Sequence, residues 1–275
     1  KYKSENVIVR SDSIFVWGRN ITEQCIVREF YMDKSFISQR SKKRIKAIIL
    51  NHNKPENADK LYELLNEAFD VEIWDSGSDS DKMPINLTKS YPNIYWTGAW
   101  NEIMRLYSDY DVVWMLGCDI ELRSKSFEYL EAIEKSLPFG CWSPCVEGRA
   151  HPFMQAHNYV HGEPVRVKNI EGMCMALTGN LMRKVNRLME GSQIGFGQDF
   201  WLCYVSRQYG MENIIDGRVK VYHPAGIGYD ENLALQQMEE TFGGFYGKNY
   251  RWNIFEYDET YEGNKMNQSK IKKEV

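Results

Sequence analysis

The chain has 275 residues, of which 43% are hydrophobic and 26% charged, as in ordinary soluble globular proteins. This length suits one large domain with modest extensions, and the longest apolar run, Val112–Leu116, is far shorter than the roughly 20 residues that span a bilayer. The net charge is −4, but residues 1–44 carry ten Lys/Arg against five Asp/Glu, and residues 264–275 carry four against one. An acidic centre disfavours a dedicated nucleic-acid binder, which needs a basic groove, whereas the basic ends could contact phosphates or an anionic membrane.

Six cysteines are spread along the chain, and only Cys141 and Cys145 lie close together. A structural zinc site usually needs a second such pair or nearby histidines. Several of the cysteines have apolar neighbours, which is typical of buried free thiols in a reducing compartment. We therefore expect a cytoplasmic protein with no transmembrane segment, whose basic ends would allow peripheral contact with the inner face of the membrane.

The first 43 residues precede the main domain. Two apolar stretches, Val7–Val9 and Ile14–Trp17, flank the polar segment Arg-Ser-Asp-Ser and predict a β-hairpin. The basic segment 38–44 indicates a linker. The expected organisation is an N-terminal extension over 1–43, an α/β domain over 44–250 and a basic tail over 251–275.

From Ile45 onward, buried strands and amphipathic helices alternate. The patterns predict strands near 45–51, 71–76, 94–98 and 112–122, and helices near 55–69, 99–107 and 126–137. This alternation predicts an α/β fold with a mixed, mainly parallel sheet and helices on both faces.

The second half of the chain is less regular. Residues 141–170 contain three prolines and three histidines and predict a long loop region, and 171–189 predicts a strand followed by a helix. A Gly-rich turn at 195–197 precedes another predicted helix. The segment 213–226 predicts a short pair of strands that ends at His223.

Polar side chains recur where the predicted strands end, among them Asp75, Asp119 and His223, and Asp199 follows the Gly-rich turn. Active sites of open α/β sheets lie beyond the carboxyl ends of the strands. Carboxylates with one imidazole suit a hard divalent cation that holds a diphosphate. A further carboxylate would then be free to act as a base.

The order of these motifs resembles that of family 2 glycosyltransferases with the GT-A fold. The resemblance covers roughly Ile45 to His223, about two thirds of the chain, and rests on several short motifs in the correct order. IWDSGSDSD (73–81) is similar to the segment whose Asp contacts the nucleotide, and VVWMLGCDIEL (112–122) to the strand that carries the DxD motif. GFGQDFWLC (195–203) is similar to the segment that contains the catalytic base, and VKVYHPAG (219–226) to a late strand that often supplies a metal-binding His.

The resemblance implies a role for each of these positions. Asp199 would be the catalytic base, and Asp119, Glu121 and His223 would bind Mn²⁺ or Mg²⁺. It also implies a nucleotide-sugar site formed by Asn51, Asn53, Asp75, Gly77, Trp100, Asn101, Gly117 and Cys118. The acceptor site would include Glu171, Gly172, Gln198 and Trp201.

Two positions depart from the family pattern. Gly117 replaces the first Asp of DxD, while Asp119 keeps the second, which is the more direct metal ligand. Gln198 replaces the acid that usually precedes the base, which removes a like charge that would raise the pKa of Asp199. Both changes leave room for an inactive relative.

Each candidate also has a simpler structural explanation. Asp75 could cap its Ser-Gly-Ser turn, and Asp119 could form an ion pair with Arg123. Asp199 could be the N-cap of the following helix, and His223 could be a core histidine.

The resemblance implies inverting transfer of a sugar from a nucleotide sugar, expected to be a UDP-sugar, to an acceptor hydroxyl on a bacterial or phage-associated glycan. One alternative is transfer to a modified nucleic-acid base. Another is a catalytically impaired GT-A-like protein that binds glycans. A nucleotidyltransferase is disfavoured because no Gly-rich loop follows the first strand, where Asn51-His52-Asn53-Lys54-Pro55 stands instead.

Overall fold

The computed structural model describes residues 6–9, 13–19, 25–31, 43–148, 162–224 and 229–246. The chain divides into two compact units, Lys1–Lys43 and Arg44–Val275. The predicted basic tail, 251–275, and residues 149–161 of the predicted loop region lie outside the described residues. In the described segments, none of the helices has both the length and the hydropathy needed to cross a membrane.

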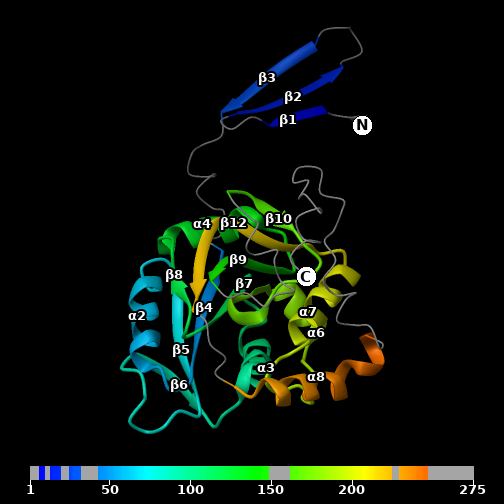
Figure 1. The fold of residues 1–275 in the computed structure, drawn as a ribbon. Coiled ribbons are helices and arrows are strands. Elements are labelled where there is room, and N and C mark those ends of the chain that lie inside the picture. Colours follow the sequence, from blue (N-terminus) through cyan, green and yellow to red (C-terminus); the bar gives the residue numbers. More distant parts are fainter. Residues whose placement is uncertain are drawn as a thin grey trace, which may run out of the picture. The chain divides into compact units, whose positions relative to one another are not determined.

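The first unit contains a three-stranded antiparallel sheet (Figure 1). The predicted hairpin is confirmed, because β1 (Asn6–Val9) pairs with β2 (Ser13–Arg19). A third strand that was not predicted, β3 (Cys25–Tyr31), pairs with β2 along its whole length. Its sequence, CIVREFY, groups apolar and charged residues and so lacks the period-two alternation that marks a strand.

The second unit is built on a nine-stranded mixed sheet with the order β10-β12-β9-β11-β7-β4-β5-β6, and β8 pairs with β12. Four neighbouring strands are parallel: β4 (Ile45–Asn51), β5 (Asp70–Ser76), β6 (Leu87–Tyr91) and β7 (Val112–Gly117). β9 (Cys141–Gly148) and β12 (Asn213–His223) run in the same direction as these four, because β11 (Ala176–Thr178) lies antiparallel to both β7 and β9. The two short strands β8 (Glu121–Leu122) and β10 (Pro164–Arg166) pair antiparallel with β12.

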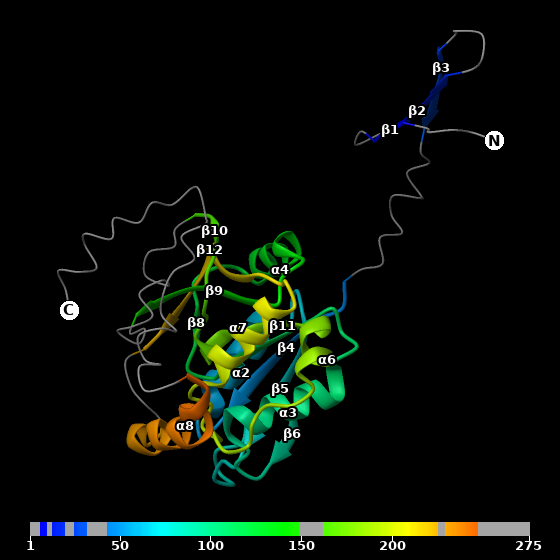
Figure 2. The ribbon, with the colours of Figure 1, turned by 90° about the vertical axis from the view of Figure 1, so that its right-hand side faces the viewer.

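Helices cover both faces of this sheet, as Figure 2 shows. One core cluster packs α2 (Pro55–Leu65) and α4 (Ser126–Ser136) against the sheet, and the other packs α3 (Tyr95–Tyr107), α6 (Gly179–Val185) and α7 (Gln198–Gln208) against the opposite face. Along β4, Ala47 and Ile49 belong to the first cluster and Ile48 to the second, as the period-two geometry of a strand requires. The predicted α/β architecture, with helices on both faces, is confirmed.

Three predicted elements were wrong. Residues 94–98 begin α3 instead of forming a strand, and the strand before α3 is β6, whose sequence LTKSY is too polar to stand out. Residues 141–148 form β9 despite Pro144, because Pro144 lies opposite Asp216, where the register with β12 shifts and a missing N–H is tolerated. The predicted pair of strands at 213–226 is the single strand β12, interrupted only by that irregularity.

One further helix, α8 (Glu231–Tyr246), was not predicted. It packs Met238 and Phe242 against the segment that precedes α7. The five cysteines whose side chains are described are buried and free, as the sequence indicated, and they are Cys118, Cys141, Cys145, Cys174 and Cys203.

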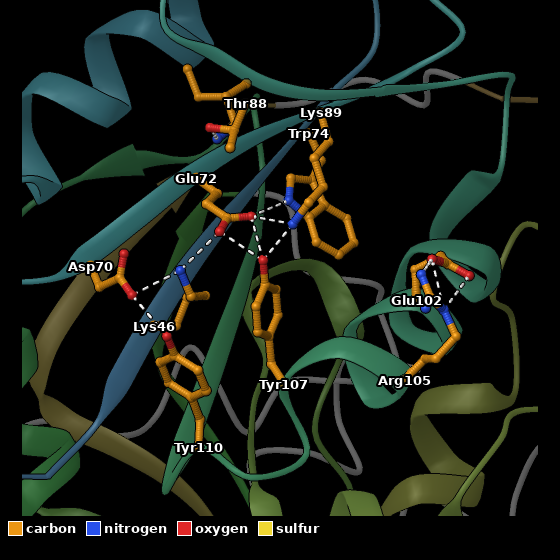
Figure 3. A network of polar contacts seen from close by, with 11 residues as sticks. Lys46, Asp70, Glu72, Trp74, Thr88, Lys89, Glu102, Arg105, Tyr107 and Tyr110 are labelled. Atoms are coloured by element: carbon orange, nitrogen blue, oxygen red, sulfur yellow. Dashed lines mark hydrogen bonds and ion pairs between the residues drawn. The ribbon is translucent and has the colours of Figure 1, made fainter.

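A buried polar network lies beneath α3, near the amino ends of β4 and β5 (Figure 3). Lys46 Nζ lies 2.8 Å from a carboxylate oxygen of Asp70 and 3.0 Å from one of Glu72. Glu72 also accepts bonds from Lys89 Nζ (2.8 Å) and from the hydroxyl of Tyr107 (2.7 Å). These bonds outweigh the effect of burial and lower the pKa of Glu72 to about 2.

Candidate active site

The main sheet brings most of the predicted site residues to one edge. β4, β5, β7 and β12 point in the same direction, so Asn51, Asp75, Gly117 and His223 stand at their carboxyl ends. The 3₁₀ turn η1 (Gly172–Cys174) precedes β11, which is antiparallel to β7, and therefore lies at the same edge. We call this edge the carboxyl edge.

Asp75 organises the loop that follows β5. It is buried, and its carboxylate accepts hydrogen bonds from Asn51 Nδ2 (2.8 Å), from the Ser78 backbone N–H (3.0 Å) and from the Ser78 hydroxyl. Asn53 Oδ1 in turn accepts the Asp79 backbone N–H at 2.8 Å. A carboxylate offers about four acceptor positions, so Asp75 has little capacity left for a ligand. Its geometry is that of the turn cap.

Gly77 closes this loop against the chain that follows β6. Its φ is +69°, and a Cβ there would lie 2.6 Å from the backbone nitrogen of Asn93. A side chain at this position would therefore separate the two loops.

Asp119 is the centre of a small charged cluster. His223 Nε2 lies 3.4 Å and Lys54 Nζ 3.8 Å from Asp119 Oδ2. Burial alone would raise the pKa of Asp119, but the bond and charge of His223 and the charge of Lys54 hold it below its usual range. Arg123 does not pair with Asp119, because its guanidinium lies 3.2 Å from Glu121. Glu121, predicted as a metal ligand, is half exposed and paired with Arg123 instead.

Asp119 and His223 fit a divalent cation as two of its ligands, because Mn²⁺ accepts both carboxylate oxygen and imidazole nitrogen. Among the residues that the structure describes, no group of three or more His, Cys, Asp or Glu could hold a metal ion. Further ligands would have to come from a bound diphosphate and water. Nδ1 of His223 is buried, and no hydrogen-bond partner for it lies in the described part of the chain, so nothing on that side fixes the ring.

Gly117 has no side chain, and the Asp119 carboxylate occupies the space that a side chain there would fill. A Cβ at position 117 would lie 2.7 Å from Asp119 Oδ1, so any side chain there would displace this carboxylate. The Asp119 carboxylate can therefore take this position only because the first acid of the DxD motif is replaced by glycine. The neighbouring Cys118 thiol is buried, which raises its pKa to about 11 and keeps it protonated at neutral pH. The Cys118 backbone N–H donates to Leu50 O at 3.1 Å, so neither group is available to a nucleotide.

Asp199 lies in the first turn of α7, beside η1. Its Oδ2 accepts the backbone N–H of Gly172 at 3.1 Å, and its Oδ1 accepts that of Phe200 at 2.9 Å. Burial of the carboxyl raises its pKa to about 7, against the opposing effect of these two bonds. The N-cap of α7 is Gly197, with φ +83°, so the N-cap explanation of Asp199 was wrong. Such a carboxyl can gain or lose its proton near neutral pH.

Tyr229 lies near the predicted carboxylates and was not among the predicted site residues. Tyr229 is 43% exposed, and partial burial together with the negative charges of Asp199, Glu231, Glu171 and Asp119 raises the pKa of its phenol to about 12. Three of the predicted carboxylates therefore lie within electrostatic reach of one side chain. Its ring packs edge to face against Phe196, with 5.5 Å between centroids. No motif marks Tyr229, because it follows β12 in a segment without periodicity.

Four further predicted site residues make contacts within the fold, and three of them are engaged in the core or in backbone hydrogen bonds, whereas Trp201 is partly exposed. Trp100 is completely buried in the core under α3, and Asn101 Oδ1 accepts the backbone N–H of Leu188 at 2.7 Å. The buried Gln198 amide bonds to the backbone of residues 189 and 192. Trp201 packs near α8 and stacks on Tyr204. The first two were misplaced because 94–98 was taken as a strand, which shifted positions 100 and 101 to its end.

Trp96 is the tryptophan that reaches the carboxyl edge. Its indole Nε1 donates to the carbonyl oxygen of Gly172 at 2.9 Å. The ring also lies so close to Gly172 and Gly195 that a Cβ at either would approach it to within 3 Å. Its position at the start of α3 would have marked it, had this helix been predicted from Tyr95.

No family model matches this sequence, and no curated protein matches it. The fold is similar to the crystal structure of GalNAc-T7 with UDP, GalNAc and Mn²⁺, with a TM-score of 0.52 at 12% sequence identity. That match covers 73% of this chain and 48% of the other, so our chain spans about half the length of that protein. A crystal structure of A197 from STIV is 11% identical over 66% of this chain and 86% of that one, with a TM-score of 0.41. The fold is therefore GT-A-like, as the sequence predicted.

Proposed function

We propose that this protein is an inverting, metal-dependent glycosyltransferase that moves a sugar from a UDP-sugar to an acceptor hydroxyl on a bacterial or phage-associated glycan. The observation that carries the proposal is the Asp199 carboxyl, whose pKa is raised to about 7, at the same sheet edge as the Asp119–His223 pair. A base is most effective when its pKa lies near the working pH. The GT-A-like fold supports the same proposal.

Asp119 and His223 would hold Mn²⁺ or Mg²⁺, which neutralises charge on a diphosphate when it is bound. Lys54 stands 3.8 Å from Asp119, at the N-cap of α2, and brings a further positive charge to this end of the site. The donor diphosphate would therefore lie at the Asp119 end, and the acceptor at the Asp199 end.

In the proposed reaction, Asp199 takes the proton of the acceptor hydroxyl. The hydroxyl oxygen then bonds to the anomeric carbon while the bond from that carbon to the diphosphate oxygen breaks. The nucleoside diphosphate leaves with the electron pair, and attack from the opposite face inverts the configuration. The backbone N–H groups of Gly172 and Phe200 hold the carboxylate in place for this step.

A catalytically impaired glycan-binding protein is the second candidate. Gly117 removes one acid from the motif, and Lys54 already pairs with Asp119 where a cation would bind. Such a protein would bind sugars without releasing UDP.

A panel of nucleotide sugars with Mn²⁺ separates the two candidates. The proposal predicts thermal stabilisation by one donor and slow UDP release by hydrolysis of that donor, both lost on chelation with EDTA. A bound donor at 100 times its Kd should add about 2.7 kcal/mol to the free energy of unfolding. Stabilisation by a glycan with no UDP release from any donor would favour the binding protein.

A further inference from the structure

Three residues from three elements form a chain of hydrogen bonds that ends at the proposed base. The indole N–H of Trp96, at the start of α3, donates to the Gly172 carbonyl oxygen at 2.9 Å. The Gly172 backbone N–H, in η1, donates to Asp199 Oδ2 at 3.1 Å. The Gly172 residue thus has its carbonyl oxygen held by Trp96 and its N–H directed at Asp199.

The Trp96 ring also fills the space between the two segments that carry this contact. A Cβ on Gly172 would lie 2.6 Å from the indole, and a Cβ on Gly195, in the turn before α7, would lie 2.9 Å from it. Both segments therefore pack directly against the ring through glycines. A smaller side chain would remove both the hydrogen bond and this support.

We propose that Trp96 is a positioning residue for Asp199: its indole fixes the Gly172 backbone so that the Gly172 N–H faces the Asp199 carboxylate. The inference rests on the proposed function only in that it makes Asp199 the base. Trp96 itself need not touch a substrate, because it acts through Gly172.

The geometry has a measurable electrostatic consequence. A hydrogen bond donated to a carboxylate favours the charged form, so loss of the Gly172 bond should raise the pKa of Asp199 further. The other titratable groups around it are Tyr229, Cys141 and Glu171. The pKa of the partly exposed Tyr229 phenol is raised to about 12 and burial raises the pKa of the Cys141 thiol, so neither group gains or loses a proton in the range where Asp199 titrates.

The chain supplies a matched control one turn along the same helix. Trp100 is fully buried with its ring 6.1 Å from that of Trp96, and its indole nitrogen has no hydrogen-bond partner among the described residues. Trp96→Phe and Trp100→Phe therefore remove the same atoms from neighbouring positions. Only the first removes a bond that leads to Asp199.

The test is a ¹³C-carboxyl NMR titration of the protein labelled at aspartate, with Asp199→Asn identifying the Asp199 signal. We expect Trp96→Phe to raise the pKa of Asp199 by roughly 1 unit, the size of one hydrogen bond to a charged group, and Trp100→Phe to leave it unchanged. No shift in Trp96→Phe, or equal shifts in both variants, would overturn the inference. If Trp96→Phe does not fold, Gly172→Ala, which forces the indole away, should give the same upward shift, and an unshifted pKa there counts equally against it.

The readout does not depend on catalysis, so it separates two kinds of failure. An upward shift in Trp96→Phe together with no UDP release by the unaltered protein would remove the proposed function and keep the positioning role. UDP release by the unaltered protein, together with an unchanged pKa of Asp199 in Trp96→Phe, would keep the proposed function and remove the positioning role.

Discussion

At the scale of single residues, the candidate site contains two carboxylates with opposite environments. Asp119 lies beside His223 and Lys54, which lower its pKa. Asp199 is buried, its hydrogen bonds to the described residues come from backbone N–H groups, and its pKa rises to about 7. Environments that separate the pKa values of two acids are a common way to assign them different roles. This contrast supports the proposed roles, with Asp119 as a permanent negative charge and Asp199 as the group that accepts a proton.

Asp199→Asn should leave donor affinity nearly unchanged and lower the transfer rate by roughly 10² to 10⁴, the usual contribution of a general base. Its pKa of about 7 also predicts that kcat falls as the pH drops below 7, because protonated Asp199 cannot accept a proton. Rates between pH 5 and 9, with the exposed Asp81→Asn as the control, measure both effects. A full rate in Asp199→Asn would place the base elsewhere.

Asp119→Ala should abolish metal-dependent donor binding and leave the fold intact, because Asp119 is partly exposed and belongs to neither core cluster. Calorimetry with UDP and Mn²⁺ gives the affinity. Glu121→Ala is the matched control, since that carboxylate pairs with Arg123 and should not affect binding. Unchanged affinity in Asp119→Ala would exclude this residue from the metal site.

At the scale of secondary-structure elements, two kinds of contact set the site's surroundings. The first is the polar network, in which Glu72 joins Lys46 and Lys89 of the neighbouring parallel strands to Tyr107 at the end of α3 (Figure 3). Trp96 lies at the other end of this helix. Asp199 lies in α7, and the turn that precedes this helix is covered by α8 through Met238 and Phe242. Substitutions at both contacts should change the stability of the fold whether or not the proposed function is correct.

Glu72→Gln should lower the free energy of unfolding by about 2 kcal/mol, because it removes the charge that Lys46 and Lys89 share, although Lys46 keeps Asp70 and Lys89 is partly exposed. The folded pKa of Glu72, about 2, lies below its unfolded value. Its stabilising contribution is therefore present above the unfolded pKa, near 4.5, and is lost as the pH falls toward 2. Urea unfolding at pH 7 and pH 3 should show the difference between the two proteins shrinking at the lower pH.

Glu102→Gln is the control for this prediction. Glu102 pairs with Arg105 three residues along the exposed side of the same helix (Figure 3), and such surface pairs contribute less than about 1 kcal/mol. Equal losses in the two variants would contradict a special role for the buried network.

Gly197→Ala and Gly210→Ala isolate the packing of α8. Both glycines have positive φ values, +83° and +68°, so each substitution costs about 1 kcal/mol of backbone strain. A Cβ at 197 would also lie 2.9 Å from Phe242 and 3.0 Å from Met238, whereas nothing lies within 4 Å of one at 210. We expect the first variant to melt several degrees below the second, and equal melting temperatures would show that α8 adjusts at no cost.

At the scale of the whole chain, the two compact units are Lys1–Lys43 and Arg44–Val275. Every residue of the candidate site belongs to the second unit, and the first has its own three-stranded sheet. The hydrogen bonds described above for the polar residues at the carboxyl edge join residues of the second unit. The N-terminal unit is therefore expected to be an accessory.

A chain that begins at Lys43 should fold cooperatively and bind UDP with Mn²⁺ as the full chain does. Its melting temperature and UDP affinity, compared with those of the full chain, are the measurements. Asp119→Ala in the shortened chain controls for non-specific binding. A folded but non-binding shortened chain would show that the N-terminal unit contributes to the site.

The α/β architecture and the mainly parallel strands could be predicted from the amino-acid sequence. Runs such as Val112–Leu116 and Ala47–Leu50 must be buried on both faces, and their alternation with amphipathic helices permits few folds. Because polar residues stand at the ends of such runs, Asp119, Asp199 and His223 were predicted as site residues from their positions along the chain, and their roles stay predictions. The fold could be predicted because burial and periodicity are local properties of the sequence.

Which polar side chains remain available to a ligand depends on contacts between distant parts of the chain, and the sequence does not show these contacts. Three side chains that the sequence suggested as ligand contacts form hydrogen bonds within the protein instead: Asp75, Asn101 and Gln198. Their partners lie in other segments of the chain or in the adjoining loop. Trp96 and Tyr229 were missed for the same reason, because their proximity to Asp199 arises from packing between α3, η1 and the segment before α8. The pKa of Asp199 follows from burial by those same elements, which no pattern of neighbouring residues encodes.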